Sequence, residues 1–501
     1  MVQNVVNIIR TRQDIWALSK QDKWHPTLLW YAKAVADMLN RPLADPTSWR
    51  YQAAIHGYSP LSDPFLGKNE QPPSGWNATP GWSSIWSQCQ HSTWYFLPWH
   101  RMYLYYFELI VADTIGKLGG PSDWALPYWN YSDSSNPDAM KIPPAFLEAK
   151  LPDGTLNPLN MAKRSSHIDP MGNIADLTKE SVSVEGCLKE RVFSAPIGSS
   201  SFGGKSTAFN HSGGTAAGSL EQTPHNDIHV FVGGDEGWMY DPDLAALDPI
   251  FWIHHANIDR LWEVWRNRTP NNVNPADNNW QKPLHSFNLS DQNGKSISFK
   301  PSQTQDIAAL NYRYDNISDP LSGFKTGVEK ETFIMTTGLE IIPELVGATE
   351  EPHLLSHETT STSFTLVQPS GPAALSARAI GKTRHIYLNI ENVVGRSPGA
   401  HTYAIHLNIP DTKTTREHLE KHRDYFVGTM ALFGLKQASS NDGSHSGNGL
   451  TFVYDVTEVI ENLKTLGKWN TKNIHVSFIP LRQHNRHPEI QVGRISLYYG
   501  D

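Results

Sequence analysis

The sequence has very little cysteine, since only Cys89 and Cys187 occur among its 501 residues. Two thiols cannot form the disulfide framework of a small secreted domain. Long hydrophobic runs are absent as well: the longest candidate, around 103–118, is interrupted by Glu108 and Asp113 and falls short of the roughly 18 apolar residues that a membrane helix needs. The formal net charge is −8, and the sequence has no basic clusters. We therefore expect neither a membrane protein nor a partner of nucleic acids.

The amino terminus lacks the apolar core followed by small residues that marks a secretory signal. The expected location is cytoplasmic, provided that no leader has been removed from the chain. At roughly 150 residues per domain, the length predicts two or three domains. What the sequence does contain in quantity is histidine, with 22 residues, and tryptophan, with 17. Abundant histidine with so little cysteine indicates a metal held by imidazoles.

The first half of the chain has the spacing of apolar residues that predicts helices. Over about 14–268 these residues recur at helical intervals, and several segments begin with Asp or Thr before Pro, a common helix start. Loops rich in Gly, Ser and Pro separate the segments. We expect helices over 45–56 and about 99–117, and further helices that begin at Thr223 and at Asp248. This half is therefore predicted to be mainly α.

The character of the sequence changes after about residue 340. The stretch 350–383 is rich in Thr, Ser, Pro and Ala, as expected of a linker. Beyond it, short runs of β-type residues recur and predict an antiparallel β domain. These runs begin at His385, Thr402, Leu450, His475 and Arg494. The predicted organisation is a helical domain over 1–340, a linker over 341–383 and a β-sandwich-like domain over 384–501.

Histidines in the helical half form groups with the spacing of metal ligands. His225 and His229 are one helical turn apart, so both rings project from one face of a helix at the separation that one metal ion needs. The other groups lie beside or within predicted helices that are rich in aromatic residues. The candidate ligands are His56, His91, His100, His225, His229, His254 and His255.

The chemistry of these candidates narrows the choice of metal. Neutral imidazoles without paired thiolates or clustered carboxylates suit copper or zinc and exclude calcium and magnesium. Six nitrogens serve two ions with three ligands each, and a three-ligand ion keeps an open position for dioxygen or for a hydrolytic water. Any single histidine of the set could equally be a satisfied core residue, but three separate groups favour metal binding.

Two of these segments resemble the signatures of the type 3 copper family, which comprises tyrosinases, catechol oxidases and haemocyanins. The stretch from His91 to Glu108 matches the first signature in full, and the stretch from Asp248 to Asp259 matches the second. The resemblance implies a mainly α catalytic domain, a four-helix bundle around a dinuclear copper site, followed by the β domain. The ligands that it implies are His56, His91 and His100 for one copper ion, and His225, His229 and His255 for the other.

The resemblance also decides between two adjacent histidines. The second signature selects His255 as the ligand and leaves His254 as a supporting residue beside the metal. Periodicity alone does not separate the two.

Cys89 stands two residues before His91, and side chains two apart in an extended segment project to the same face. Some members of the resembling family link a cysteine at this offset to the ligand histidine through a thioether. The resemblance therefore implies a Cys89–His91 crosslink that restrains the imidazole. The alternative is an ordinary buried thiol.

Charged residues accompany the proposed ligands. Arg101 follows His100, and Asp259 lies four residues after His255, which predicts a buried ion pair or a carboxylate that orients an imidazole. Solvated surface charge is the alternative. The segment 312–314 resembles the paired-tyrosine motif that closes the catalytic domain of the family, where it packs against an arginine for which Arg10 or Arg12 would serve.

Glu221 and Asn226 match positions that hold an ordered water in the resembling enzymes. A carboxylate aided by an amide could orient that water to deprotonate an incoming phenol. The alternative is that both residues merely belong to the start of a helix. The position thirteen residues before the last implied ligand, often a bulky Phe in plant catechol oxidases, is Pro242 here, so we expect a less obstructed copper site.

In plant and fungal members of the family, a β domain shields the copper site and can keep the enzyme latent by placing a hydrophobic side chain in the substrate pocket. The resemblance implies the same role here, with the linker as a cleavage region. Candidates for the blocking side chain are Tyr403, Phe426 and Phe433, and the sequence does not choose between them. The alternative is a structural sandwich that packs elsewhere.

The reaction that the resemblance implies is the oxidation of small phenols by dioxygen: ortho-hydroxylation of monophenols and oxidation of o-diphenols to o-quinones. One alternative is a catechol oxidase limited to diphenols, and another is a dioxygen carrier like haemocyanin. A dinuclear zinc hydrolase is disfavoured, because such sites usually include carboxylate ligands. The sequence leaves open whether the chain forms a homo-oligomer.

Overall fold

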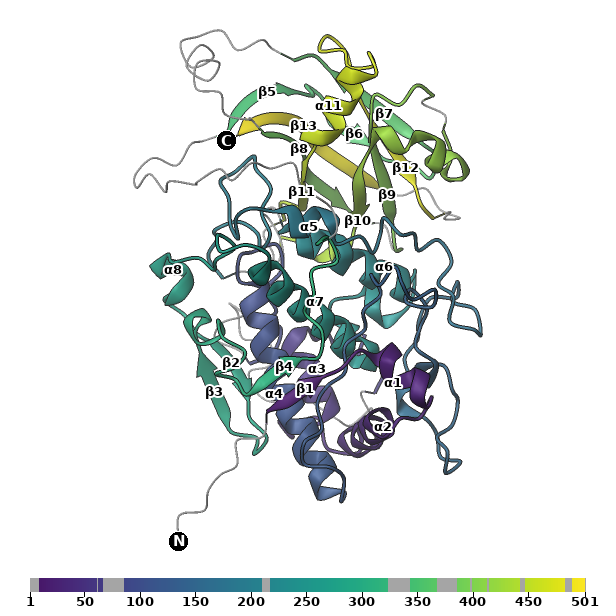
Figure 1. The fold of residues 1–501 in the computed structure, drawn as a ribbon, viewed down its shortest axis with the longest axis vertical. Helices are drawn as coiled ribbons and strands as arrows, with labels where there is room; N and C mark the ends of the chain where they lie inside the picture. Colours follow the sequence, from purple (N-terminus) through teal and green to yellow (C-terminus); the bar gives the residue numbers. More distant parts are fainter. Residues whose placement is uncertain are drawn as a thin grey trace.

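The computed structural model describes residues 9–60, 62–65, 85–209, 217–322, 343–366, 385–396, 399–411, 414–441, 447–482 and 489–500. Helices gather in the lower part of Figure 1 and the larger β-sheets in the upper part, as predicted for a helical domain followed by a β domain. Of the helices in these residues, none combines the length and the hydrophobicity needed to cross a membrane.

The helical domain is built around long central helices whose side chains fill one core. Fully buried tryptophans such as Trp99 and Trp252 lie on these helices and pack with their neighbours. Its elements are β1 (Arg10–Arg12), α1 (Ile15–Gln21), α2 (Pro26–Leu39), α3 (Trp49–His56), α4 (Phe96–Lys117), α5 (Glu185–Lys189), a π-helical turn (Glu221–Asn226), α6 (Asp227–Gly233), α7 (Pro249–Arg268), α8 (Asn278–Gln281), β2 (Phe287–Ser290), β3 (Ser296–Phe299) and β4 (Tyr312–Tyr314).

Two predicted helix starts are shifted. The helix expected from Asp45 begins only at Trp49, because the Asp45 carboxylate accepts a hydrogen bond from the Thr47 amide and forms a turn, while Ser48 caps the helix by accepting from Tyr51. The helix expected from about Trp99 already begins at Phe96, with a proline in its first turn, where the missing amide proton costs no hydrogen bond.

The helix expected to begin at Thr223 is interrupted. Thr223 has an extended backbone (φ −144°, ψ 125°), so the turn around His225 is kinked, and regular helix begins at Asp227. The prediction for Asp248 is confirmed, because its carboxylate caps α7 by accepting from the Ile250 amide, with Pro249 at the first helical position.

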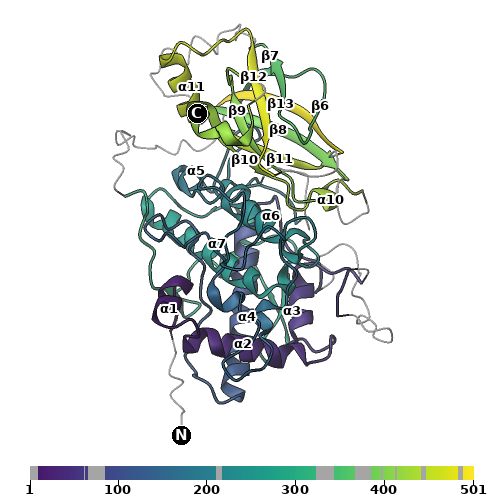
Figure 2. The same ribbon diagram turned by 90° about the vertical axis from the view of Figure 1, so that its right-hand side faces the viewer.

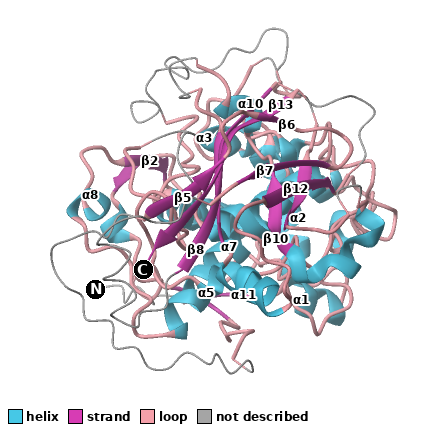
Figure 3. Cartoon of the chain, turned by 90° about the horizontal axis from the view of Figure 1, so that it is seen from above, coloured by secondary structure: helices cyan, strands magenta, loops and turns pink. Residues whose placement is uncertain are grey.

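The β domain consists of two antiparallel sheets around its own core. One sheet has the strand order β10-β9-β12-β7, and the other has the order β11-β8-β13-β5, with β6 also paired to β13. Its elements are β5 (Glu344–Ala348), β6 (His353–Leu354), β7 (Thr360–Phe364), β8 (His385–Gly395), β9 (Thr402–Leu407), a 3₁₀ segment (Arg416–Tyr425), β10 (Phe426–Ala431), α10 (Leu435–Ala438), β11 (Leu450–Asp455), α11 (Thr457–Thr465), β12 (Ile474–Pro480) and β13 (Ile490–Gly500). Figure 3 shows the two groups of strands from above.

The linker predicted over 341–383 is wrong in its first part. Strands β5, β6 and β7 fall inside it, and they pair with β13 and β12 of the β domain. Strand β7 has the sequence TSTSF and lies at the edge of its sheet. Its Thr-rich composition suits a strand as well as a linker, so local composition does not distinguish the two. The rest of the predicted linker, 367–383, and the expected boundary near residue 340 lie outside the described residues.

The β domain packs on the part of the helical domain that contains α6. In Figure 2, β10, β11 and α10 face α5 and α6. Gln222 and Val453 exchange two hydrogen bonds across this contact, and the Thr429 hydroxyl donates to Asp227 over 2.9 Å. The contact therefore joins the β domain directly to the segment that carries His225 and His229.

Candidate dinuclear metal centre

Six of the predicted ligands meet in the core of the helical domain. His56 ends α3, His100 lies in the second turn of α4, and His91 precedes that helix, while the other three come from the π-helical turn, α6 and α7. Every one of these side chains is at most 6% exposed. The six are His56, His91, His100, His225, His229 and His255.

The six rings form two sets of three that face each other. In the first set, His56, His91 and His100, the ring centroids are 5.2 to 5.7 Å apart. In the second set, His225, His229 and His255, they are 4.6 to 5.5 Å apart. His100 and His255 stack across the two sets at 4.4 Å with 5° between their planes. The arrangement is that of two adjacent metal positions.

In four of the six rings, a hydrogen bond fixes which nitrogen points inward. The Nδ1 atoms of His56, His100 and His229 lie 2.7 to 2.9 Å from backbone carbonyl oxygens, so each Nδ1 carries the proton and donates. The Nδ1 of His225 is likewise 2.8 Å from the amide oxygen of Asn226. The Nε2 lone pairs are thereby left for a metal ion, as in sites where a carbonyl orients the ligand histidine.

The donor atoms fit metal ions of the copper or zinc type. The Nε2 atoms of His91, His100 and His225 are buried and have no hydrogen-bond partner, which is costly unless an ion is bound. Within the described residues, the groups close enough to share an ion contain histidine and Cys89 and no carboxylate. Burial is the main cause that lowers the pKa of five of these imidazoles, and a lowered pKa keeps each ring neutral, as a metal ligand must be. The five are His91, His100, His225, His229 and His255.

Cys89 lies beside the His91 imidazole, as expected from its position two residues earlier in the chain. Its Sγ atom is 3.4 Å from Nδ1 of His91, and both side chains are buried. Burial raises the pKa of the Cys89 thiol well above its usual value, and neither cysteine forms a disulfide. Cys187 donates to the Val184 carbonyl, and among the described residues it belongs to none of the groups that are close enough to share an ion.

Glu221 and Asn226 line a small cavity beside the two sets of rings. One oxygen of Glu221 accepts from the Ser92 amide over 2.8 Å, and the other oxygen is buried without a partner. The cavity has a volume of about 20 Å³ and is lined by His91, Ser92, Glu221, Asn226, Pro242, Phe433, Gly434 and Leu450. This space accommodates about one water molecule among polar partners. Burial raises the pKa of Glu221 to about 8.

Phe433 of the β domain closes this cavity. Its ring stacks on His229 with centroids 4.1 Å apart and 20° between the planes, and it also contacts His91 and His225 at their ring edges. Of the other two candidates, Tyr403 donates to the Ser356 carbonyl and Phe426 packs on His406. Phe433 is therefore the candidate that reaches the centre. The less obstructed site expected from Pro242 is not seen, because Phe433 of the β domain covers the centre beside it.

Arg101 and Asp259 form the buried ion pair that was one of the two expectations. The Arg101 Nε atom is 2.5 Å from Asp259, and Arg101 also donates to Glu263. Asp259 accepts from Arg12, Tyr312 and Tyr314, so in this structure it orients no imidazole. The arginine over the tyrosine pair is Arg12, whose guanidinium lies 4.0 Å from the Tyr312 ring. This network ties the first strand to α4 and α7 behind the centre.

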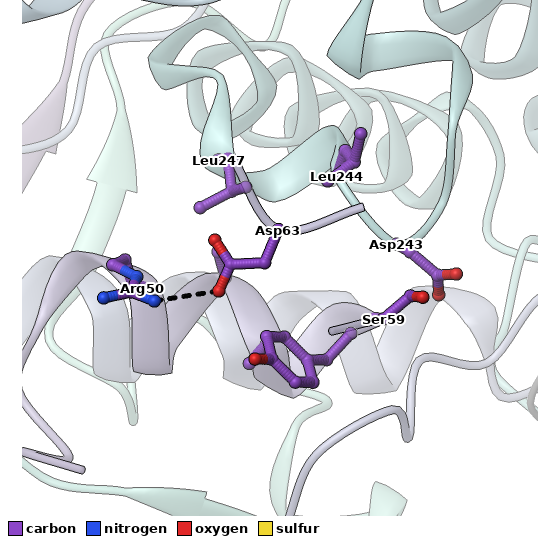
Figure 4. Close-up of a pocket in the computed structure, with 10 residues that line it drawn as sticks. Arg50, Ser59, Asp63, Asp243, Leu244 and Leu247 are labelled. Atoms are coloured by element: carbon purple, nitrogen blue, oxygen red, sulfur yellow. Dashed lines mark hydrogen bonds and ion pairs between the residues drawn. The ribbon is translucent and has the colours of Figure 1, made fainter. Parts of the chain in front are cut away.

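A second small cavity borders α3, and none of the candidate ligands lines it. Figure 4 shows the Arg50–Asp63 ion pair, with an N–O distance of 2.9 Å, near Ser59 and Asp243. Its volume is about 10 Å³, which leaves no room for an organic ligand.

The contacts between the β domain and the turn that carries His225 were not predicted from the sequence. Asp227 is buried between Thr223 and Thr429, both of which donate to its carboxylate. These partners are about 200 residues apart in the chain, and no local pattern marks such a pair.

Comparisons with known proteins agree with this geometry. A family model described as the common central domain of tyrosinase matches residues 46–268, and a domain of unknown function (DUF7868) matches residues 342–500. Polyphenol oxidase A1, chloroplastic, from Vicia faba is 29% identical, over 58% of this chain and 45% of its own. The structure of latent apple tyrosinase superposes with a TM-score of 0.65 and 20% identity, covering 98% of this chain and 97% of the other, which shows a shared fold.

One relative matches along its whole length. Tyrosinase HcTyr1 from Hahella sp. (strain CCB-MM4) is 38% identical to this chain, and the match covers 98% of this chain and 99% of the relative. Identity of this extent reflects common ancestry of both the helical and the β domain, and the chain belongs to the tyrosinase family.

Proposed function

We propose that this chain is a copper-dependent phenol oxidase that hydroxylates monophenols at the ortho position and oxidises the resulting o-diphenols to o-quinones with dioxygen. The observation that carries the proposal is the double set of three buried imidazoles with inward-facing Nε2 atoms and no carboxylate among them. His56, His91 and His100 would hold one copper ion, and His225, His229 and His255 the other. Bound copper supplies the reaction with dioxygen that amino-acid side chains cannot perform.

The side chains around the centre orient the substrate. The face of the His229 imidazole, now covered by Phe433, is the surface on which a phenol ring would stack. Stacking there places the phenol hydroxyl toward the metal positions and excludes water, which lowers the entropic part of the barrier.

Glu221 and Asn226 support the hydroxylation of monophenols. The unpartnered oxygen of Glu221 and the amide nitrogen of Asn226, whose oxygen is engaged by His225, can together hold one water in the cavity that they line. Through this water the Glu221 carboxylate would take the proton of the incoming phenol, and a group with a pKa near neutrality is suited to that exchange.

We also propose that the uncleaved chain is latent. Phe433 occupies the stacking position, and a cavity of about 20 Å³ cannot admit a phenol. Substrate access therefore requires the β domain to move or to be removed.

The Cys89–His91 pair is proposed to form a thioether. The new bond joins Sγ to a ring carbon of His91, replacing the S–H and C–H bonds. Two protons and two electrons would leave, and dioxygen, the oxidant of the proposed reaction, would accept them as hydrogen peroxide. The sulfur–imidazole contact of 3.4 Å supports this step.

Assays with L-tyrosine and L-DOPA on the copper-loaded protein, before and after limited proteolysis, test the main proposal. We expect oxidation of both compounds, with rates that rise after proteolysis. Turnover of L-DOPA alone would reduce the function to a catechol oxidase. Reversible dioxygen binding without turnover of either compound, even after proteolysis, would indicate a dioxygen carrier.

A further inference from the structure

Two of the proposed ligands lie on a segment with little regular helix of its own. His225 belongs to the π-helical turn, which the extended backbone of Thr223 interrupts, and His229 belongs to α6. Helix α6 has only seven residues, about two turns, and an isolated helix of that length is marginal in water. His255, the third ligand of the same set, lies instead on α7, which has 20 residues. The positions of His225 and His229 therefore depend on what packs against their segment.

The β domain contacts this segment before the first of the two ligands and after the second. Before them, the amide of Val453 in β11 donates to the Gln222 side chain over 3.1 Å, and that side chain donates back to the Val453 carbonyl. After α6, the Ala400 amide donates to Asp235 over 3.1 Å. Because both ligands lie between these points, the β domain clamps residues 222–235 from outside the helical domain.

Thr429 in β10 makes a hydrogen bond between the two ligands. Its hydroxyl donates over 2.9 Å to Asp227, which is two residues from both His225 and His229 and is 0% exposed. The Thr223 hydroxyl donates to the same carboxylate oxygen and lies 3.1 Å from the Thr429 hydroxyl. A buried carboxyl group needs such donors, because a buried polar atom without a partner is costly. One side chain of the β domain thus completes a buried cluster inside the clamped segment.

We propose that Thr429 is a positioning residue: through Asp227, the β domain holds the two ligands of residues 222–235 where they bind their ion, and its displacement loosens that ion before the other. This inference rests on the dinuclear copper centre proposed above. The hydrogen bonds of the clamp reach the segment of the second set, whereas His91 of the first set meets the β domain through the edge of the Phe433 ring. Removal of the β domain therefore opens the centre and also weakens the hold on one of its two ions.

Thr429→Val tests the proposal in the uncleaved chain, because it keeps the shape of the side chain and removes the hydroxyl while Phe433 still covers the centre. Thr429→Ser keeps the hydroxyl and should restore wild-type behaviour. The matched control is Thr402→Val, since Thr402 lies on the neighbouring strand β9, is equally buried, and has a hydroxyl without a hydrogen-bond partner. Phe433→Ala is the converse variant, which opens the centre and leaves the clamp in place.

Two measurements are made on each chain. The first is hydrogen–deuterium exchange of the metal-free protein, compared between the amides of residues 222–235 and those of α7. The second is the number of copper ions bound and the rate at which a chelator removes each ion. The exchange measurement needs no metal, so it reports on the clamp independently of the copper assignment.

For Thr429→Val we expect faster exchange in residues 222–235, unchanged exchange in α7, and release of one of the two ions about tenfold faster or more, since loss of a group that orients a ligand typically weakens metal binding by that much. Thr429→Ser and Thr402→Val should match the wild type. Phe433→Ala should release both ions faster and leave the exchange of residues 222–235 unchanged.

The proposal is wrong if Thr429→Val matches the wild type in exchange and in release, because the helical domain alone would then position the two ligands. Equal acceleration of both ions by Thr429→Val would also overturn it, since that result indicates a general opening of the centre. Faster exchange in Thr429→Val together with fewer than two ions bound by the wild type would instead overturn the dinuclear centre itself.

Discussion

The ring of Phe433 lies parallel to the imidazole of His229, with centroids 4.1 Å apart, although the two residues belong to different domains. Phe433 follows β10, whose Thr429 donates to Asp227 in the same helix as His229. The β domain thus contacts both the face of a proposed copper ligand and the helix that carries it. In the proposed latent state, access to the centre would therefore depend on the position of the β domain.

Phe433→Ala should activate the uncleaved enzyme. Its ring contributes about 1.5–3 kcal/mol through burial and about 0.5–1.5 kcal/mol through stacking, so its loss should raise L-DOPA oxidation by the intact chain about tenfold or more. Steady-state rates without protease measure this. Phe426→Ala is the control, since Phe426 packs on His406 in the same domain. Equal activity of Phe433→Ala and wild type would show that Phe433 does not restrict access.

The position of a proteolytic cut should decide how strongly the enzyme is activated. Strands β5 and β7 precede residues 367–384 but belong to the sheets of the β domain. A cut within 367–384 should leave the domain bound through these strands and give little activation, whereas a cut within 323–342 should allow it to dissociate. Insertion of one protease site at either place, followed by size-exclusion chromatography and L-DOPA assays, distinguishes the two. Full activation by the first cut alone would contradict the expectation.

Glu221→Gln should affect monophenols more than diphenols. The amide keeps the shape of the side chain and can still contact the Ser92 amide, but it cannot take up a proton. Loss of a general base typically lowers kcat about 10²-fold or more, so we expect that loss for L-tyrosine and a much smaller one for L-DOPA. Copper content measured on the same samples should be unchanged. A parallel loss for both compounds would assign Glu221 a structural role.

The stability of the chain should fall as pH rises through neutrality, in part because of Glu190. Burial raises the pKa of this carboxyl to about 7, against the lowering effect of hydrogen bonds from Ser219 and Ser200. A raised pKa means that Glu190 binds its proton more tightly in the folded state than in the unfolded state. The resulting gain in folding stability is complete below pH 4.5, the usual pKa of the carboxyl, and is lost as the pH rises through about 7. Because Glu190 is partly exposed, we expect a loss on the order of 1 kcal/mol.

Glu190→Gln should remove this part of the pH dependence. Thermal melting of wild type and variant between pH 5 and pH 8 compares the two chains. The variant should gain stability relative to wild type at pH 8 and not at pH 5. An identical pH profile for both proteins would refute the assignment.

The thioether should be visible in the mass of the intact protein. Incubation with copper and dioxygen should lower the mass by two hydrogen atoms and remove one titratable thiol, and Cys89→Ser should show neither change. Cys187→Ser, which alters the thiol away from the centre, should still show the mass loss. An unchanged mass after copper loading would rule out the bond.

The sequence by itself determined the helical and β halves and the candidate ligands. Periodicity places His225 and His229 on one face whether or not the first turn is regular, and the cap formed by Asp248 and Pro249 depends only on neighbouring residues. The predictions were wrong where one local pattern is compatible with two structures. Asp45 was expected to begin a helix and forms a turn, and residues 344–364 were expected to be a linker and form strands.

Only the tertiary structure decided what depends on contacts distant in the chain. It selected Phe433 among three aromatic residues, Arg12 over Arg10, and an ion pair with Arg101 as the role of Asp259. It also placed His254 beside the rings of His225, His229 and His255. The physical reason is that side-chain spacing within one helix or strand follows from backbone geometry, whereas the choice between equivalent side chains follows from how separate elements pack.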